Sequence, residues 1–262
     1  MDITKMFLET EKPLDNLVTD GGFCKIFRTI GCVGDSLASG EFETIDAEGK
    51  KSYHDLFEYS WGQYIARACG SKVYNFSRGG MTAKEYMESF AQAKDFWNPE
   101  KKAQAYIVAL GVNDILNRNM ELGTLDDIKE DYRDNAPTFA GYYGAIIQRY
   151  KEIEPDAKFF LMTMPKKGKE ERDAKCDKHA ALLYQMAELF SNTYILDLMK
   201  YAPLYDESFV ENFFLNGHMN PCGYILTAQM TMSYIDYIIR HNMKDFAEVG
   251  LIGTPFKNIK PQ

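Results

Sequence analysis

Three short segments of the sequence carry side chains that could perform acyl transfer. Ser36 ends the apolar run in TIGCVGDSLASG, His218 lies in NGHMNP, and Asn113 lies in GVND. A serine hydroxyl attacks a carbonyl carbon once a base removes its proton, and an imidazole can take that proton and then return it to the leaving group. The residue types therefore predict Ser36 as the nucleophile and His218 as the base.

Acyl transfer also needs hydrogen-bond donors that face the oxygen atom on which negative charge develops. The backbone N–H of Ser36 is one candidate, and the side-chain amide of Asn113 is a second, neutral one. A third is a backbone N–H in SRGGMT, where a glycine leaves room for a close approach. We assign this donor to Gly80, with Gly79 as the alternative. Together the three donors would form an oxyanion hole.

Each of these residues taken alone has a structural interpretation. Gly-Asp-Ser after a strand is typical of a helix N-cap, and Asp35 would stiffen that turn by accepting backbone N–H bonds. His218 alone is typical of a loop histidine. The joint occurrence of these residues at successive strand ends favours catalysis. The other histidines lie in polar or helical stretches and are predicted to be solvated, namely His54, His179 and His241.

The elements that must position these residues follow from the hydrophobic pattern, because short apolar runs alternate with longer helical patterns. Strands are predicted at 25–33, 72–76, 105–110, 158–164 and 193–198. Helices are predicted at about 55–69, 82–96, 138–153, 172–190 and 222–242. Such a series predicts an α/β fold, with a parallel sheet covered by helices on both faces and ligands at the carboxyl ends of the strands. The insertions are expected to cover that edge, at 41–54, 115–137 and 199–217.

Composition sets the outer limits of the prediction. A chain of 262 residues that is 45% hydrophobic can bury a full-sized core, so we expect one domain over 1–262, with its core at about 25–242 between an N-terminal extension and a C-terminal tail. The formal net charge of −8 and the lack of a basic block argue against nucleic acid as a partner. The start of the chain lacks the pattern of a secretory signal, and no apolar stretch has the length of a membrane span. We therefore expect a cytoplasmic protein without integral membrane association.

The sequence predicts no metal and no cofactor. Its five cysteines are widely separated without a CxxC pair, and no histidine pair has the spacing of metal ligands. Gly79 and Gly80 lack the three-glycine spacing of a dinucleotide site, and no phosphate-binding GxxxxGK motif occurs.

Four segments resemble the four sequence blocks of the SGNH (GDSL) hydrolases, in order and at suitable spacing. They are GDSL at 34–37, RGGMT at 78–82, GVND at 111–114 and GHMNPCGY at 217–224. The resemblance covers roughly 25–242. It implies a flavodoxin-like three-layer α/β/α fold, a metal-free serine esterase activity, and the roles given above for Ser36, Gly80, Asn113 and His218.

The sequence departs from this family at one position. The family usually carries an aspartate three residues before the histidine, where it orients the imidazole, and this chain has Leu215 there. Another acceptor would have to hold the Nδ1–H group of His218. A backbone carbonyl could do so, as could a carboxylate from the segment YDESFVEN, which contains Asp206, Glu207 and Glu211.

Three functions follow as alternatives. The first is an esterase that cleaves a small-molecule ester through an acyl-Ser36 intermediate, with a small acyl group such as acetyl, for example on a carbohydrate. The second is an acylhydrolase of the lipase, lysophospholipase or thioesterase kind. The third, which Leu215 motivates, is a non-catalytic homologue that only binds a ligand. The apolar patch in the tail after Asn242 could dock on the body or on a second subunit, so a homo-oligomer stays open.

Overall fold

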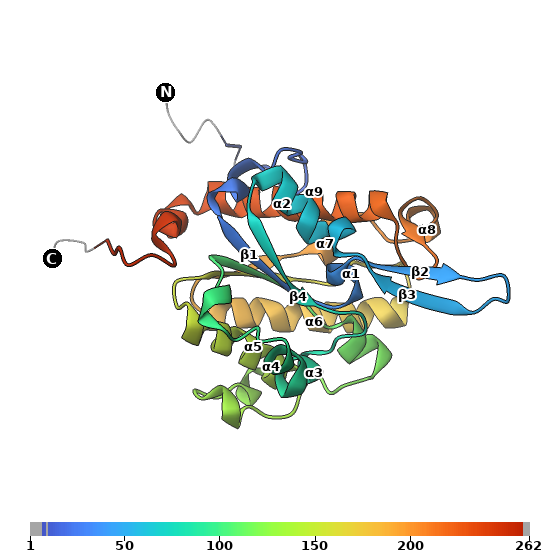
Figure 1. Ribbon diagram of the computed structural model, residues 1–262, viewed down its shortest axis with the longest axis horizontal. Coiled ribbons are helices and arrows are strands. Elements are labelled where there is room, and N and C mark those ends of the chain that lie inside the picture. Colours follow the sequence, from blue (N-terminus) through green and yellow to red (C-terminus); the bar gives the residue numbers. More distant parts are fainter. Residues whose placement is uncertain (1–6, 9, 259–262) are drawn as a thin grey trace.

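A five-stranded parallel sheet forms the centre of the protein, in a computed structural model that describes residues 7–8 and 10–258 (Figure 1). The strand order is β4-β1-β5-β6-β7. The strands span β1 Thr29–Gly34, β4 Lys72–Ser77, β5 Ala105–Ala109, β6 Lys158–Met162 and β7 Thr193–Leu196. The first strand of this sheet lies between the second and the third, which is the flavodoxin-like doubly wound order. The direction in which successive strands are added to the sheet therefore reverses between β1 and β5.

The register places the ends of the first three strands at one level. Gly34 at the end of β1 is paired with Ser77 at the end of β4 and with Ala109 at the end of β5. The segments that follow these strands therefore meet at the same carboxyl edge of the sheet. They contain Ser36, the Gly79–Gly80 turn and Asn113.

Two layers of helices cover the sheet, as Figure 1 shows with α2 and α9 on one side and α5 and α6 on the other. The first layer consists of α2 Trp61–Cys69 and α9 Pro221–His241. The second contains α3 Ala83–Glu85, a π-helical turn Tyr86–Phe90, α4 Ala91–Ala93, α5 Phe139–Ile153 and α6 Glu170–Leu189.

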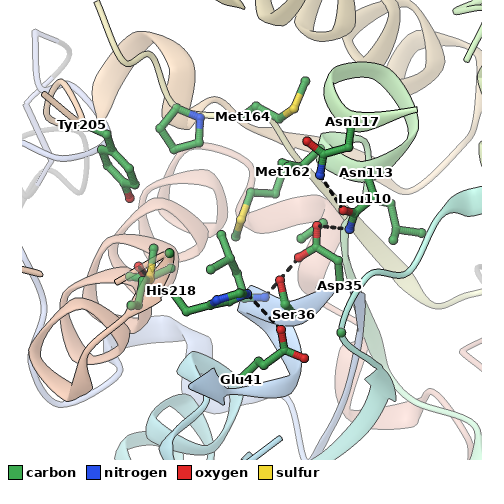
Figure 2. Close-up of a pocket in the computed structure, with 18 of the residues that line it drawn as sticks. Asp35, Ser36, Glu41, Leu110, Asn113, Asn117, Met162, Met164, Tyr205 and His218 are labelled. Atoms are coloured by element: carbon green, nitrogen blue, oxygen red, sulfur yellow. Dashed lines mark hydrogen bonds and ion pairs between the residues drawn. The ribbon is translucent and has the colours of Figure 1, made fainter. Parts of the chain in front are cut away.

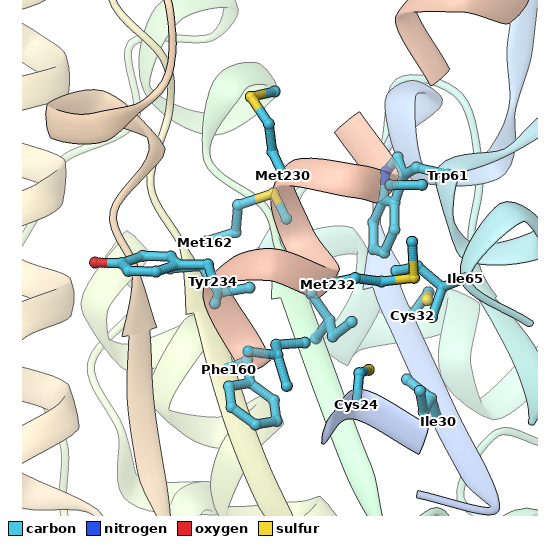
Figure 3. Close-up of a cluster of buried hydrophobic side chains, with 14 of the residues drawn as sticks. Cys24, Ile30, Cys32, Trp61, Ile65, Phe160, Met162, Met230, Met232 and Tyr234 are labelled. Carbon is cyan, nitrogen blue, oxygen red and sulfur yellow. The ribbon is translucent and has the colours of Figure 1, made fainter. Parts of the chain in front are cut away.

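Each layer encloses its own apolar core. Against α2 and α9, Cys32 and Phe160 of the sheet pack with Trp61, Ile65 and Met232 (Figure 3). On the other face the core is rich in aromatic rings, among them Phe76, Tyr106, Tyr150 and Phe159. Burial on both faces explains why the strand sequences are nearly continuous apolar runs.

All five predicted strands and all five predicted helices are present. The first strand is shorter than predicted, because Gly22–Ile26 form a 3₁₀ helix and β1 begins only at Thr29. Gly21 and Gly22 have φ angles of 91° and 47°, and the Phe23 N–H donates to Asp236 of α9 at 2.7 Å. These contacts hold the chain in a helical turn ahead of the sheet. The strand therefore starts later than the apolar composition of 25–33 predicts.

The insertion at 41–54, for which no strand is predicted from the sequence, belongs to an antiparallel hairpin made of β2 Glu41–Ile45 and β3 Lys51–Asp55. Short elements complete the carboxyl edge: α1 Ser36–Ser39, α7 Leu198–Tyr201, α8 Glu207–Phe213 and the second hairpin of β8 Phe214–Leu215 and β9 His218–Met219. Within the described ranges no helix combines the length and apolar character that crossing a bilayer requires.

Candidate active site

A cavity of about 600 Å³ opens at the carboxyl edge of the sheet, where ligands of open α/β sheets bind. Its walls include all four residues that the sequence singles out for catalysis, together with Gly79. They are Ser36, Gly80, Asn113 and His218. Figure 2 shows Ser36 and His218 facing the same space, with Asp35 and Asn113 on one side and Glu41 on the other.

Ser36 is the first residue of α1, and Asp35 is its N-cap. One Asp35 carboxylate oxygen accepts the N–H of Leu37 at 3.1 Å. The turn before it is tight, since a Cβ on Gly34 would lie 2.5 Å from the Cβ of Ala38. Burial raises the pKa of Asp35 to about 7, although the N–H of Leu37 favours its anion. The structural role expected for Asp35 agrees with this cap.

Asn113 lies across the cavity from His218 (Figure 2), and Gly80 also lines the cavity. The Asn113 side-chain amide donates to the carbonyl of Met81 at 3.1 Å and lies 3.4 Å from Asp35, and its oxygen accepts from Asn117 at 2.8 Å. These contacts fix which end of the amide carries the donor. Gly80 has a left-handed φ of 69°, and a Cβ there would meet nothing within 4 Å.

Gly79 and Gly80 are distinguished by their surroundings. Both line the cavity, but a Cβ on Gly79 would collide with the carboxylate of Glu41. Among the described residues no acceptor takes the N–H of Gly80 or that of Ser36. Both N–H groups are therefore available to a ligand, as an oxyanion hole requires.

His218 begins β9 and lies between two carboxylates. Its Nε2 is 2.9 Å from Oε1 of Glu41, and its Nδ1 is 3.6 Å from Oε2 of Glu43. Burial by itself lowers the pKa of the imidazole, but the two carboxylates outweigh burial, so the pKa of His218 is raised above its ordinary value. The two carboxylates therefore favour the protonated ring more than water does.

Glu43 is held firmly beside the imidazole. Its side chain is only 3% exposed and forms an ion pair with Lys51 at 2.6 Å, while the Gly217 N–H donates to it at 3.2 Å. The Asn216 side chain, on a residue with a left-handed φ of 57°, donates to the Glu43 carbonyl at 2.9 Å. The bond to Lys51 is the main reason that the pKa of Glu43 is lowered. Glu43 is thus an anion that is tied to both hairpins.

The carboxylates expected from YDESFVEN do not reach the imidazole. Asp206, Glu207 and Glu211 are exposed and none of them lines the cavity. Asp206 instead caps α8, where it accepts the N–H of Phe209 at 2.9 Å. Leu215 is paired with His218 across the hairpin and is 46% exposed.

The acidic neighbours of His218 come from the hairpin β2–β3, which sequence reasoning missed. Its strands EFETI and KSYHD flank a turn, and in each strand an aromatic residue, Phe42 or Tyr53, alternates with polar residues. That alternation was the available signal. The position of the hairpin against His218 depends on contacts between distant parts of the chain, which no local pattern contains.

His179 also differs from its prediction as a solvated residue. It is fully buried, packs 5.4 Å from the ring of Phe139 and would lie 2.7 Å from a Cβ on Gly111. Burial lowers its pKa to about 4. His179 lies on the face of helix α6 that packs against the core. Its polar sequence neighbours lie on the other face, so they do not indicate its burial. In the part of the chain that the structure describes, no group of three or more His, Cys, Asp or Glu side chains could hold a metal ion.

Comparisons with known proteins agree with this architecture. The model of the GDSL-like Lipase/Acylhydrolase family matches residues 32–226. No curated protein sequence matches the chain significantly.

Solved structures share the fold at low sequence identity. A Lactobacillus plantarum protein is 15% identical, with a TM-score of 0.59 over 80% of this chain and 97% of its own. A carbohydrate esterase family 2 enzyme from Corynascus thermopiles (Myceliophthora fergusii) is 14% identical, with a TM-score of 0.56 over 81% of this chain and 66% of its own. A family two carbohydrate esterase from Clostridium thermocellum, an active-site mutant, is 15% identical, with a TM-score of 0.52 over 83% and 64%. The chain therefore spans about two thirds of the length of these two esterases.

Proposed function

The chain belongs to the GDSL-like lipase/acylhydrolase family, and on that premise we propose that it is a serine esterase that works through an acyl-Ser36 intermediate. The observation that carries the proposal is the convergence on one cavity of Ser36, His218 and two backbone N–H groups, those of Ser36 and Gly80, that no described residue accepts. Ser36, Gly80, Asn113 and His218 take the roles that the sequence suggests for them.

The proposed reaction has two halves. Ser36 Oγ attacks the ester carbonyl while His218 takes the hydroxyl proton, and the N–H groups of Ser36 and Gly80 with the amide of Asn113 bind the oxyanion. The C–O bond to the leaving alcohol breaks as His218 returns the proton to that oxygen. Water, deprotonated by His218, then attacks the acyl-serine, and Ser36 regains its proton as the acid is released.

We assign the orienting role to Glu43. In the neutral imidazole, a proton on Nδ1 would face the Glu43 carboxylate, and this leaves the lone pair of Nε2 for the serine proton. Glu41 faces Nε2 in the free protein, so substrate binding has to release the imidazole from Glu41. On this proposal Glu43 of β2 takes the place of the aspartate that the family usually has where this chain has Leu215.

Labelling with a fluorophosphonate probe tests the proposal. The expected result is a covalent adduct that mass spectrometry maps to Ser36, and loss of both the adduct and ester hydrolysis in Ser36→Ala. Ser39→Ala is the matched control, since Ser39 lies in the same short helix α1 but does not line the cavity. A protein that binds esters but neither labels nor hydrolyses them would instead be the non-catalytic homologue that Leu215 suggests.

The acyl group is the second part of the proposal. We favour a small acyl group, and the names of the two carbohydrate esterases above make acetylated sugars a natural first substrate. Apolar side chains along the cavity, among them Met162, Met164 and Leu198, would also accept a longer chain. Rates with para-nitrophenyl esters from acetate to palmitate separate these cases: a rate that climbs with chain length overturns the small-acyl assignment.

A further inference from the structure

The charged side chains of the cavity are separated by sign. The acidic ones, Asp35 and Glu41, lie beside Ser36 and His218. The cationic ones, Lys167 and Arg172, come from the segment that follows β6 and from the first turn of α6. Because the whole chain is acidic, with a formal net charge of −8, two cations in one cavity wall are a local exception that asks for an explanation.

Lys167 is a cation that forms no ion pair with any described residue. Its side chain is half-buried, and among the described residues no carboxylate forms an ion pair with it. Burial is the first cause that lowers the pKa of its ammonium group, followed by the nearby charges of Arg172 and Lys169. Nζ lies 5.6 Å from the centre of the Phe214 ring, which also lines the cavity. The free protein thus holds a partly desolvated charge at the cavity wall.

The segment that carries Lys167 is rigidly built. The Asp173 carboxylate accepts the N–H of Lys167 at 3.0 Å and that of Gly168 at 2.8 Å, and it also pairs with Arg172 at 3.2 Å. Arg172 in turn donates to the carbonyl of Pro165 at 2.9 Å. Asp173 offsets part of the charge of Arg172, whereas Lys167 keeps its own.

A third donor lies at the same end of the cavity. Tyr205 is 4% exposed, and its buried hydroxyl lies beside Thr227 but forms no hydrogen bond of ordinary geometry among the described residues. Buried tyrosine hydroxyls normally have one. The Tyr205 N–H donates to the carbonyl of Lys166 at 2.8 Å, which ties this residue to the Lys167 segment. Figure 2 shows the Tyr205 ring on the opposite side from Asn113, with Met162 and Met164 between them in this view.

We propose that Lys167, Arg172 and Tyr205 form a subsite for an anionic group, a carboxylate, carried by the ester substrate. The carboxylate would supply the charge partner that Lys167 lacks and an acceptor for the Tyr205 hydroxyl, while the acidic end of the cavity would repel it from Glu41. The substrate is therefore an ester whose acyl or alcohol part bears a carboxylate, held by the cations while Ser36 meets the carbonyl. This inference rests on the proposed esterase function and deepens it.

Two pairs of probes test the subsite, each pair matched in size and shape and differing in charge, with each rate divided by that of spontaneous hydrolysis. Para-nitrophenyl hemisuccinate and para-nitrophenyl levulinate place the carboxylate, or a neutral methyl ketone of the same shape, on the acyl part. Para-acetoxybenzoate and para-acetoxyacetophenone do so on the alcohol part. In wild-type protein we expect kcat/KM to favour the anionic member of one pair by about tenfold or more, and the pair that shows it identifies the part that bears the charge.

Variants connect the preference to the subsite. In Lys167→Gln the preference for the anionic probe should fall by about tenfold, because the charged contact is lost. Arg172→Gln and Tyr205→Phe should each reduce the preference less, since Arg172 is partly neutralised and Tyr205 contributes one hydrogen bond. Lys166→Gln is the matched control: Lys166 is paired with Asp177 outside the cavity wall, and its loss should leave the preference intact.

The outcomes separate the subsite from the esterase function. Ser36-dependent hydrolysis without a charge preference in either pair, or with a preference that survives Lys167→Gln, overturns the subsite and leaves the esterase function standing. If no probe is hydrolysed, the esterase function fails, and calorimetry on the Ser36→Ala variant decides the subsite. Tighter binding of para-acetoxybenzoate than of para-acetoxyacetophenone, lost in Lys167→Gln, supports it, and equal binding overturns it.

Discussion

The Glu43 carboxylate lies 3.6 Å from Nδ1 of His218, although the two residues belong to different hairpins. The Asn216 and Gly217 donors join the hairpins at this point, so the backbone of the histidine turn itself holds the glutamate. On the proposed function, this acid from a separate hairpin would orient the histidine in place of one from the preceding turn.

Replacing Glu43 by glutamine should slow catalysis strongly. The amide keeps the size of the side chain but can no longer hold a proton on Nδ1, and the corresponding Asp→Asn change in a serine protease costs about 10⁴ in kcat. Because the contact here is longer, we expect a loss of about 10² in kcat, measured with para-nitrophenyl acetate. Asp206→Asn and Glu211→Gln are the controls and should retain full activity. A Glu43→Gln enzyme as fast as wild type would contradict the assignment.

Replacing Glu41 by glutamine should shift the pH dependence of the reaction. Activity needs neutral His218, so kcat/KM falls as the pH drops through the imidazole pKa, which the two carboxylates raise. Removing the Glu41 charge lowers that pKa, and the acid limb of the profile should move to lower pH. The pH–rate profiles of the two proteins measure this directly. An acid limb that stays in place, or moves to higher pH, would show that Glu41 does not control the ionisation.

Loss of the Asn113 amide should act on the transition state more than on binding. Asn113→Ala removes one oxyanion donor, and we expect kcat to fall by about 10²–10³ with little change in KM. Because the side chain also contacts Asp35 and Asn117, the melting temperature of the variant has to be measured beside its kinetics. A variant that melts like wild type and keeps its kcat would remove Asn113 from the oxyanion hole.

The buried acid Asp35 should make stability depend on pH. Its folded pKa of about 7 lies above that of an unfolded aspartate, so the folded protein binds the proton more tightly and loses stability as the pH rises from about 4 to 7. The loss for this one group is on the order of 4 kcal/mol. Asp35→Asn keeps the helix cap and should show a flatter profile in denaturant unfolding. Parallel profiles for the two proteins would argue that Asp35 is charged in the fold.

The sheet could be predicted from the sequence because its strands are buried on both faces. Runs such as AYIVA and KFFLM can be recognised from their apolar composition alone. The polar residues and glycines that follow such runs, among them Ser36, Gly80 and Asn113, mark the carboxyl edge. For the same reason Ser36, Gly80 and Asn113 could be expected to meet at one edge of the sheet, whereas His218 is expected from the loop before the last helix and lies in the hairpin β8–β9.

The acid beside His218 could not be predicted in this way. Glu43 resembles a solvated residue in a charged segment, and only the fold buries it against Gly217 and Lys51. The cationic end of the cavity has the same origin, since Lys167 stands in a run of charges that looks uniformly exposed. In both cases, burial is decided by contacts between segments that are far apart in the chain.

The hairpin β2–β3 is important for the site but weakly attached to the rest of the protein. It carries both carboxylates that contact His218, yet from Thr44 to Asp55 most of its residues are exposed and it belongs to no larger sheet. Its anchors lie near its base, where Tyr224 donates to the Glu41 carbonyl at 2.6 Å. A hairpin attached in this way can detach locally while the layered core stays folded. Heating should therefore abolish turnover at a lower temperature than that at which the far-ultraviolet circular dichroism of the helices changes. Substrate, by engaging His218, should reduce the difference between these two temperatures.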